Sequence, residues 1–138
     1  MKEVFKYLIL GIIYGFIYNF IEVIYRGYTH WTMWVLAFIV GILIGAINNV
    51  ISWNISLFKQ LILGVIIATS LEFLFGCIIN IELGWNVWDY SNVPFNIMGQ
   101  VCLPFSVIWG ILCLILIIVD DYIRYYFFNE QKPQYNLF

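Results

Sequence analysis

Four long apolar stretches alternate with shorter polar ones along the chain of 138 residues. The apolar stretches cover residues 7–25, 33–51, 61–81 and 101–119. Each has close to the roughly 20 residues that a helix needs to cross the hydrocarbon core of a bilayer. They are joined by two short turns and one longer connection, at residues 26–32, 52–60 and 82–100. This pattern predicts an all-α integral membrane protein, a four-helix transmembrane bundle that forms one domain over residues 1–138.

The composition supports a membrane location and excludes one class of partner. Hydrophobic residues make up 64% of the chain and charged residues 10%, whereas about 25% of a typical globular domain is charged. A soluble fold of this size could not bury so much apolar surface, so the lipid bilayer is the expected partner. The formal net charge of −2 argues against nucleic acid, which is bound by a basic face.

Lys and Arg residues near the ends of the spans predict the orientation, because cytoplasmic segments retain positive charge. One side of the membrane would carry Lys2, Lys6, Lys59, Arg124 and Lys132. The other side would carry only Arg26. We therefore expect a multi-pass protein with both termini in the cytoplasm. The turn at 26–32 and the aromatic-rich connection at 82–100 would then lie outside.

Two carboxylates fall within the apolar stretches, where a charge is costly and needs a local reason. Glu22 has Arg26 one turn away, so the pair either anchors the helix end or contributes to a pocket. Glu72 lies close to the midplane, about 16 Å from the cytoplasmic start of its span at 1.5 Å per residue. Asn19 and Trp109 lie at comparable depths and are the candidate partners, Asn19 in preference to Arg26 and Trp109 through its indole N–H. We expect Glu72 to face the bundle interior and to be hydrogen-bonded.

The longer connection concentrates aromatic and hydrogen-bonding side chains between the third and fourth spans. It forms either an interfacial belt or a lid over an outward-facing polar pocket whose floor is Glu72. The candidate residues for binding a solute in that pocket are Asn19, Glu22, Arg26, His30, Glu72, Asn80, Trp88, Asp89, Asn96 and Gln100.

The sequence contains no pattern typical of a metal centre, a bound cofactor or a nucleophilic enzyme. Glu22, His30, Glu72 and Asp89 are ligand types suited to divalent ions, but they show no ligand spacing. The chain has one histidine and no Gly-x-Ser-x-Gly elbow. It also lacks a Walker A sequence, so it cannot bind ATP in the P-loop manner. We predict no metal, no cofactor and no assigned catalytic residue.

Several polar and aromatic blocks resemble a bacterial family. They are Tyr14-Gly15-x-x-Tyr18-x-x-x-Glu22-x-x-x-Arg26-Gly27, His30-Trp31-Thr32-Met33, Thr69-x-x-Glu72-x-x-x-Gly76-x-x-x-Asn80, Trp88-Asp89-Tyr90-Ser91, Pro94-x-Asn96-x-x-Gly99-Gln100-x-Cys102 and Trp109. Together they are similar to the CmpB-like proteins, the family named "Putative ABC-transporter type IV". The resemblance implies a small multi-pass protein of a bacterial plasma membrane with a permease-like role in transport. It also implies an ATPase or other membrane subunit as a partner, or a homo-oligomer.

Three hypotheses for the function follow. The first is a permease-like or accessory component of a transporter with an outward-facing polar pocket. The second is a structural or regulatory membrane protein whose polar residues lock the helices together. The third is an intramembrane enzyme that acts on a lipid-linked substrate at the outer leaflet, with Glu72, His30 or Asp89 as the general acid or base. The sequence favours a transport role over an enzyme.

Overall fold

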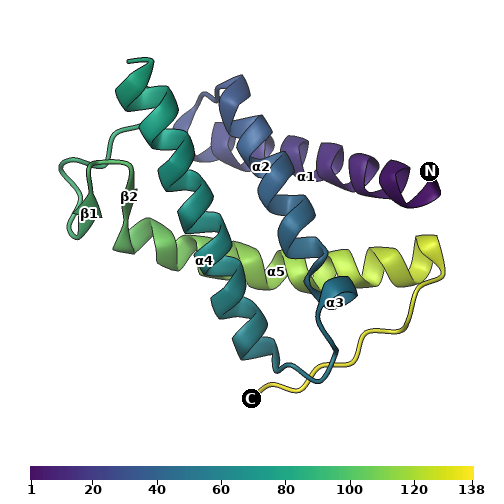
Figure 1. Ribbon diagram of the computed structural model, residues 1–138. Helices are drawn as coiled ribbons and strands as arrows, with labels where there is room; N and C mark the ends of the chain where they lie inside the picture. The colour runs from purple at the N-terminus through teal and green to yellow at the C-terminus, as the bar shows by residue number, and fades with distance from the viewer. The chain divides into compact units, whose positions relative to one another are not determined.

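The structure, a computed structural model, describes residues 1–138 and is almost entirely helical (Figure 1). In chain order the elements are α1 (Lys2–Arg26), α2 (Trp31–Gly45), α3 (Ile47–Val50), α4 (Leu57–Gly76), the π-helix η1 (Cys77–Glu82), β1 (Asn96–Ile97), β2 (Val101–Cys102) and α5 (Leu103–Phe128). The chain forms two compact units, Met1–Leu43 and Ile44–Phe138, and each is described by itself.

Four helical segments are long and apolar enough to cross a membrane, which confirms the predicted fold class. They are Lys2–Arg26, Trp31–Val50, Leu57–Glu82 and Leu103–Phe128. The fourth begins two residues later than the sequence pattern indicates, because Val101 and Cys102 belong to β2. Pro104 then lies in the first turn of α5, where its missing N–H leaves no hydrogen bond unmade.

In the first unit, α1 and α2 approach closely where one helix carries glycine. A Cβ atom on Gly11 would lie 2.7 Å from the ring of Phe38, and one on Gly15 would lie 2.6 Å from Nε1 of Trp34. Gly41 of α2 meets Tyr14 of α1 in the same way, at 2.7 Å. Small residues at helix contacts are expected in lipid, where close packing replaces the hydrophobic drive between helices.

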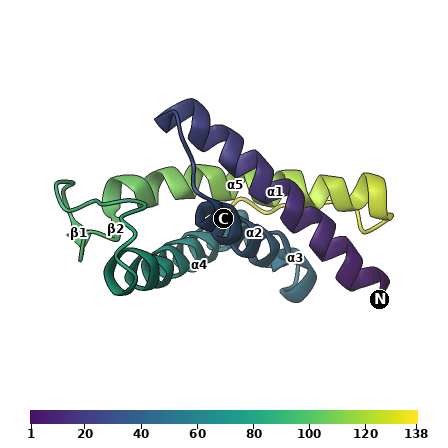
Figure 2. The same ribbon diagram turned by 90° about the horizontal axis from the view of Figure 1, so that it is seen from above.

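In the second unit, α4 and α5 cross (Figure 1) and are joined at one end by the long connection (Figure 2). A Cβ atom on Gly64 would lie 3.3 Å from Cβ of Cys113, and the hydroxyl of Thr69 donates to Ser106 Oγ at 3.3 Å. Beyond Gly76, α4 widens into η1. The connection then returns through the antiparallel pair β1 and β2, in which Asn96 lies opposite Cys102. The contact between the two helices is thus both apolar and hydrogen-bonded.

The C-terminal tail runs back to the start of α4 (Figure 1, yellow). The first N–H groups of a helix have no partner within it and need one from elsewhere. Here the N–H of Leu57 donates to the carbonyl of Asn136 at 2.6 Å, and that of Phe58 donates to the carbonyl of Leu137 at 3.3 Å. Ser56, the N-cap, accepts the next N–H with its hydroxyl oxygen. The tail therefore completes the cap of α4.

The glycine contacts predict opposite effects for the same substitution at two sites. We expect Gly41→Ala to lower the thermal unfolding midpoint in detergent, because the new Cβ would press on Tyr14. Overpacking costs roughly 1–3 kcal/mol, which exceeds the gain of about 1 kcal/mol from replacing glycine within a helix. The control is Gly110→Ala, whose Cβ would meet only Val65, at an ordinary contact distance of 3.5 Å. Without overpacking, this substitution should raise the unfolding midpoint. If Gly41→Ala were as stable as Gly110→Ala, the contact with Tyr14 would not constrain α1 and α2.

Candidate functional site

Glu72 is buried within a membrane-spanning helix and is hydrogen-bonded by two other segments. Its side chain is 1% exposed. Nε1 of Trp109, on α5, donates to Oε2 at 3.0 Å, and the hydroxyl of Tyr90, in the connection, donates to Oε1 at 3.0 Å. This confirms that Glu72 is buried and hydrogen-bonded, with Trp109 as one donor. The carboxylate therefore joins α4, α5 and the connection at one point.

The backbone of the connection positions Tyr90 for this contact. Its N–H donates to the carbonyl of Gly99 at 2.7 Å, which fixes it against the turn between β1 and β2. Its ring stacks on Phe105 of α5 with the ring centroids 4.7 Å apart. Gly99 has φ of +72°, a left-handed conformation that glycine adopts without strain, and its backbone lies against Ser91 and Asp89. A tyrosine from an irregular segment is thus held with its hydroxyl inside the unit.

Asn80, Trp88 and Gln100 form a second group of hydrogen bonds, which links η1 to the connection. The amide of Asn80, in η1, donates to Oε1 of Gln100 at 2.9 Å and accepts the N–H of Val87 at 2.7 Å. Nε1 of Trp88 donates to the carbonyl of Gln100 at 2.9 Å. A Cβ atom on Gly76 would lie 2.6 Å from Oε1 of Gln100, so glycine is what lets this side chain lie on the helix. All three sequence candidates are buried and fasten the connection to η1.

Asp89 and Asn96 shape the turns of the connection. The Oδ1 atom of Asp89 accepts the N–H of Ser91 at 2.8 Å and also its hydroxyl, and these hydrogen bonds hold the pKa of Asp89 below its usual value. Asn96 donates to the carbonyl of Val93 at 2.9 Å and accepts the N–H of Gly99 at 3.0 Å. Both side chains thus satisfy nearby backbone groups. Asp89 is exposed at the surface of the connection, whereas Glu72 is buried.

The four candidates in the first unit make local contacts at the ends of α1 and α2. Arg26 donates to Oε1 of Glu22 at 2.7 Å across one turn of α1. The side-chain oxygen of Asn19 accepts the hydroxyl of Thr29 at 3.2 Å. Nδ1 of His30 accepts the N–H of Thr32 at 3.3 Å, at the start of α2. These contacts give each of the four candidates a structural role at a helix end. The binding of a solute by the ten sequence candidates stays a prediction.

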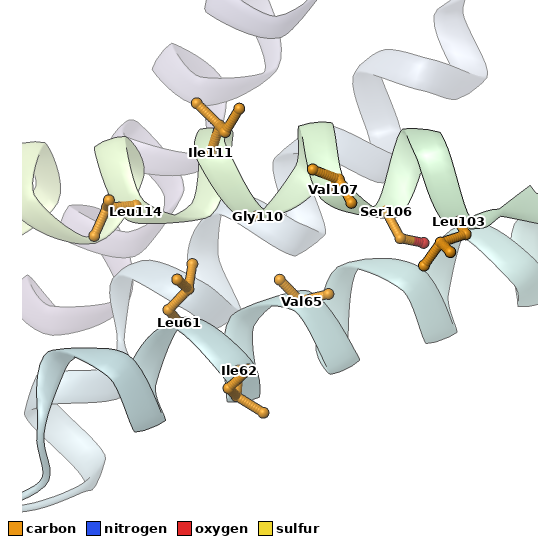
Figure 3. A pocket seen from close by; sticks show the side chains of 9 residues that line it. All are labelled: Leu61, Ile62, Val65, Leu103, Ser106, Val107, Gly110, Ile111 and Leu114. Carbon is orange, nitrogen blue, oxygen red and sulfur yellow. The ribbon is translucent and has the colours of Figure 1, made fainter. Parts of the chain in front are cut away.

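A groove runs along the contact between α4 and α5 (Figure 3). Its volume is about 380 Å³. Figure 3 shows Leu61 and Val65 of α4 pointing toward α5, where Gly110 leaves room between neighbouring turns. The remaining lining residues are Ile62, Leu103, Ser106, Val107, Ile111 and Leu114. None of the ten sequence candidates lines this groove, and its chemistry suits hydrocarbon rather than a polar solute.

A second buried polar group, at the opposite end of α5, is absent from the candidates chosen from the sequence. Asp120, Asp121 and Arg124 are each at most 3% exposed. Nε of Arg124 donates to Asp120 at 2.5 Å, and the amide of Asn48, on α3, donates to Asp121 at 2.5 Å. A Cβ atom on Gly45 would lie 2.6 Å from Asp120, so the last residue of α2 packs directly against this group. The sequence does contain a signal for this group. Two adjacent acids directly follow the fourth apolar stretch, and Arg124 comes one helical turn later.

Tyr135 joins the C-terminal tail to this group. Its hydroxyl donates to Oδ2 of Asp121 at 2.7 Å, and its ring lies against Trp53 with the centroids 5.8 Å apart. Burial raises the pKa of the Tyr135 phenol above its usual value, and the hydrogen bond to the Asp121 carboxylate raises it further. The tail therefore binds through a protonated tyrosine.

Removal of either donor to Glu72 should destabilise the protein. In Tyr90→Phe and in Trp109→Phe a buried carboxylate oxygen loses its partner, which costs about 1–3 kcal/mol. We expect a lower unfolding midpoint in detergent for both variants. In a Glu72→Leu background the same substitutions should have little further effect, because they no longer remove a partner.

Tyr126→Phe is the matched control for Tyr90→Phe, because Tyr126 is 69% exposed. It also loses a single hydroxyl but leaves Glu72 untouched. A Tyr90→Phe variant as stable as Tyr126→Phe would show that the Tyr90 hydroxyl does not support Glu72.

The tail should detach at alkaline pH. Because the folded state raises the pKa of Tyr135, its contribution to stability is full below the ordinary tyrosine pKa of about 10 and is lost as the pH rises through the folded value. We expect Tyr135→Phe to be less stable at neutral pH and to lose less stability on alkalisation than the unmodified protein. The measurement is the unfolding midpoint as a function of pH. An identical alkaline loss in both proteins would exclude Tyr135 as its source.

Comparison with known proteins places the chain in a family. Neither a curated protein nor a solved structure matches it. The sequence model of one protein family matches residues 1–136, nearly the whole chain, and agrees with the resemblance found in its polar blocks. The chain therefore belongs to the family described as "Putative ABC-transporter type IV".

Proposed function

We propose that this chain is a permease-like or accessory membrane subunit of a transporter in a bacterial plasma membrane. Its family and its four candidate spans support a transport-related membrane protein. The chain has no Walker A sequence. Hydrolysis of ATP would therefore come from a separate ATPase subunit bound to it.

The buried carboxylate of Glu72 is the observation that carries this proposal. An ionisable side chain within a membrane span is by default the mark of a functional site, because it is costly to keep there. Its partner Tyr90 belongs to the connection, so any movement of that segment changes the hydrogen bonding of Glu72. We propose that the connection admits a solute and that Glu72 responds to its displacement.

A structural or regulatory role is the second candidate, and one observation favours it. Both carboxylate oxygens of Glu72 already accept hydrogen bonds within the unit, and Glu72 does not line the apolar groove between α4 and α5. In this alternative the hydrogen bonds only lock α4, α5 and the connection together. The two candidates differ in whether the protein works with an ATPase.

The proposed orientation places both termini and the turn at residues 52–60 in the cytoplasm, with the connection outside. It rests on the positions of Lys and Arg. Asn54 and Asn92 are exposed side chains beyond opposite ends of the segment formed by α4 and η1. They can therefore report which end meets a cytoplasmic partner.

An assembly test addresses the partner and the orientation together. The full chain is tagged, extracted gently from its own membrane, and carries a photo-reactive amino acid at position 54 or, as the matched control, at position 92. We expect the purified assembly to hydrolyse ATP. A cross-link to the ATPase subunit should form from position 54 and not from position 92. Glu72→Leu should reduce the rate of hydrolysis, whereas Tyr126→Phe should not.

Two results would contradict the proposal. A chain that is recovered alone, without ATP hydrolysis, would favour the structural or regulatory role. Cross-links to the ATPase from position 92 alone would show that the orientation is reversed.

A further inference from the structure

The tip of the long connection exposes large apolar side chains. Phe95 is 79% exposed, Ile97 59% and Met98 63%. We call these three residues the apolar tip. Phe95 has φ of +56° and Met98 has φ of +54°, a left-handed conformation that is uncommon for bulky side chains. The surrounding structure thus maintains a backbone strain that presents apolar groups outward.

The backbone around the apolar tip satisfies its own hydrogen bonds. The carbonyl of Phe95 accepts the N–H of Leu103 at 3.3 Å, and the carbonyl of Ile97 accepts the N–H of Gln100 at 3.0 Å. The side chain of Gln100 donates to the carbonyl of Met98 at 2.9 Å. Asn96 does the same for the carbonyl of Val93. In lipid no water is present to satisfy such groups, so a segment that enters it must do so internally.

The apolar tip is also continuous with the membrane-spanning part of the chain and carries no charge. No Asp, Glu, Lys or Arg occurs from Tyr90 to Val119, a range that includes both the tip and most of α5. β1 and β2 lie beside the start of α5 in both views (Figures 1 and 2). A partner protein recognised by charge or by hydrogen bonds would find neither at the tip.

We propose that the apolar tip inserts into the lipid leaflet at that end of α4 and α5. Phe95, Ile97 and Met98 enter the region between the head groups and the acyl chains, in the manner of other interfacial apolar anchors. Asp89 and Ser91, whose exposed side chains are polar, stay in water. The insertion holds the connection against the membrane surface, and with it Tyr90 over Glu72. This proposal is independent of the transport role and of which side of the membrane is cytoplasmic.

The depth of a spin label tests the insertion. The full chain, with its three cysteines replaced by serine, carries a label at Met98→Cys or at the control Asn92→Cys, in vesicles of phosphatidylcholine without any other protein. We expect the label at position 98 to collide more often with oxygen, which concentrates in lipid, than with a water-soluble nickel complex. The label at position 92, exposed in the same connection, should show the reverse.

A second measurement leaves the native cysteines in place, in case the serine background does not fold. Phe95→Trp and the control Asn92→Trp are compared in vesicles whose lipids carry bromine near the head-group end of the acyl chains. Bromine should quench the added fluorescence of the first variant and not that of the second.

Two outcomes would overturn the proposal. If the label at position 98 were as accessible to nickel as that at position 92, the tip would stand in water. If it were shielded from both oxygen and nickel, it would be covered by protein, such as a second copy of this chain.

Discussion

The second unit depends on a carboxylate that is kept inside a membrane-spanning helix. In hydrocarbon such a group must find its hydrogen-bond donors within the protein, because neither lipid nor bulk water supplies them. Trp109 provides one donor from a neighbouring helix, and Tyr90 provides the other from the connection. The connection cannot move away from α4 and α5 without leaving an oxygen of Glu72 unsatisfied. One interaction thus couples a surface segment to the interior of the membrane domain.

Much of the polar side-chain content of the connection serves the backbone. Asn96 and Gln100 of the connection, like Asn80 of η1, each contact one of its main-chain N–H or C=O groups that no helix or long strand would satisfy. An irregular segment beside a bilayer has many such groups and little water to meet them. The amides of this segment are therefore explained by its fold, and they do not by themselves require a polar ligand. Glu72 differs, since its partners are side chains of other segments.

The sequence predicted the features that follow from local pattern. Apolar length gave the four spans, helical spacing gave the pair Glu22 and Arg26, and counting residues along helices gave the match in depth between Glu72 and Trp109. The sequence did not predict Tyr90 as the second donor to Glu72, because the position of Tyr90 depends on the path of an irregular segment. Nor did it predict the contact of Asp121 with Asn48, which requires the two ends of the unit's sequence to meet.

The cap of α4 has a consequence for how the protein is made. The carbonyls that complete it belong to residues 136 and 137, which leave the ribosome long after the helix itself has been synthesised. During translation the start of α4 must therefore keep other partners, such as water at the membrane surface. Maturation of this end of the domain is then a late event, and it follows synthesis of the last helix instead of accompanying the insertion of the third.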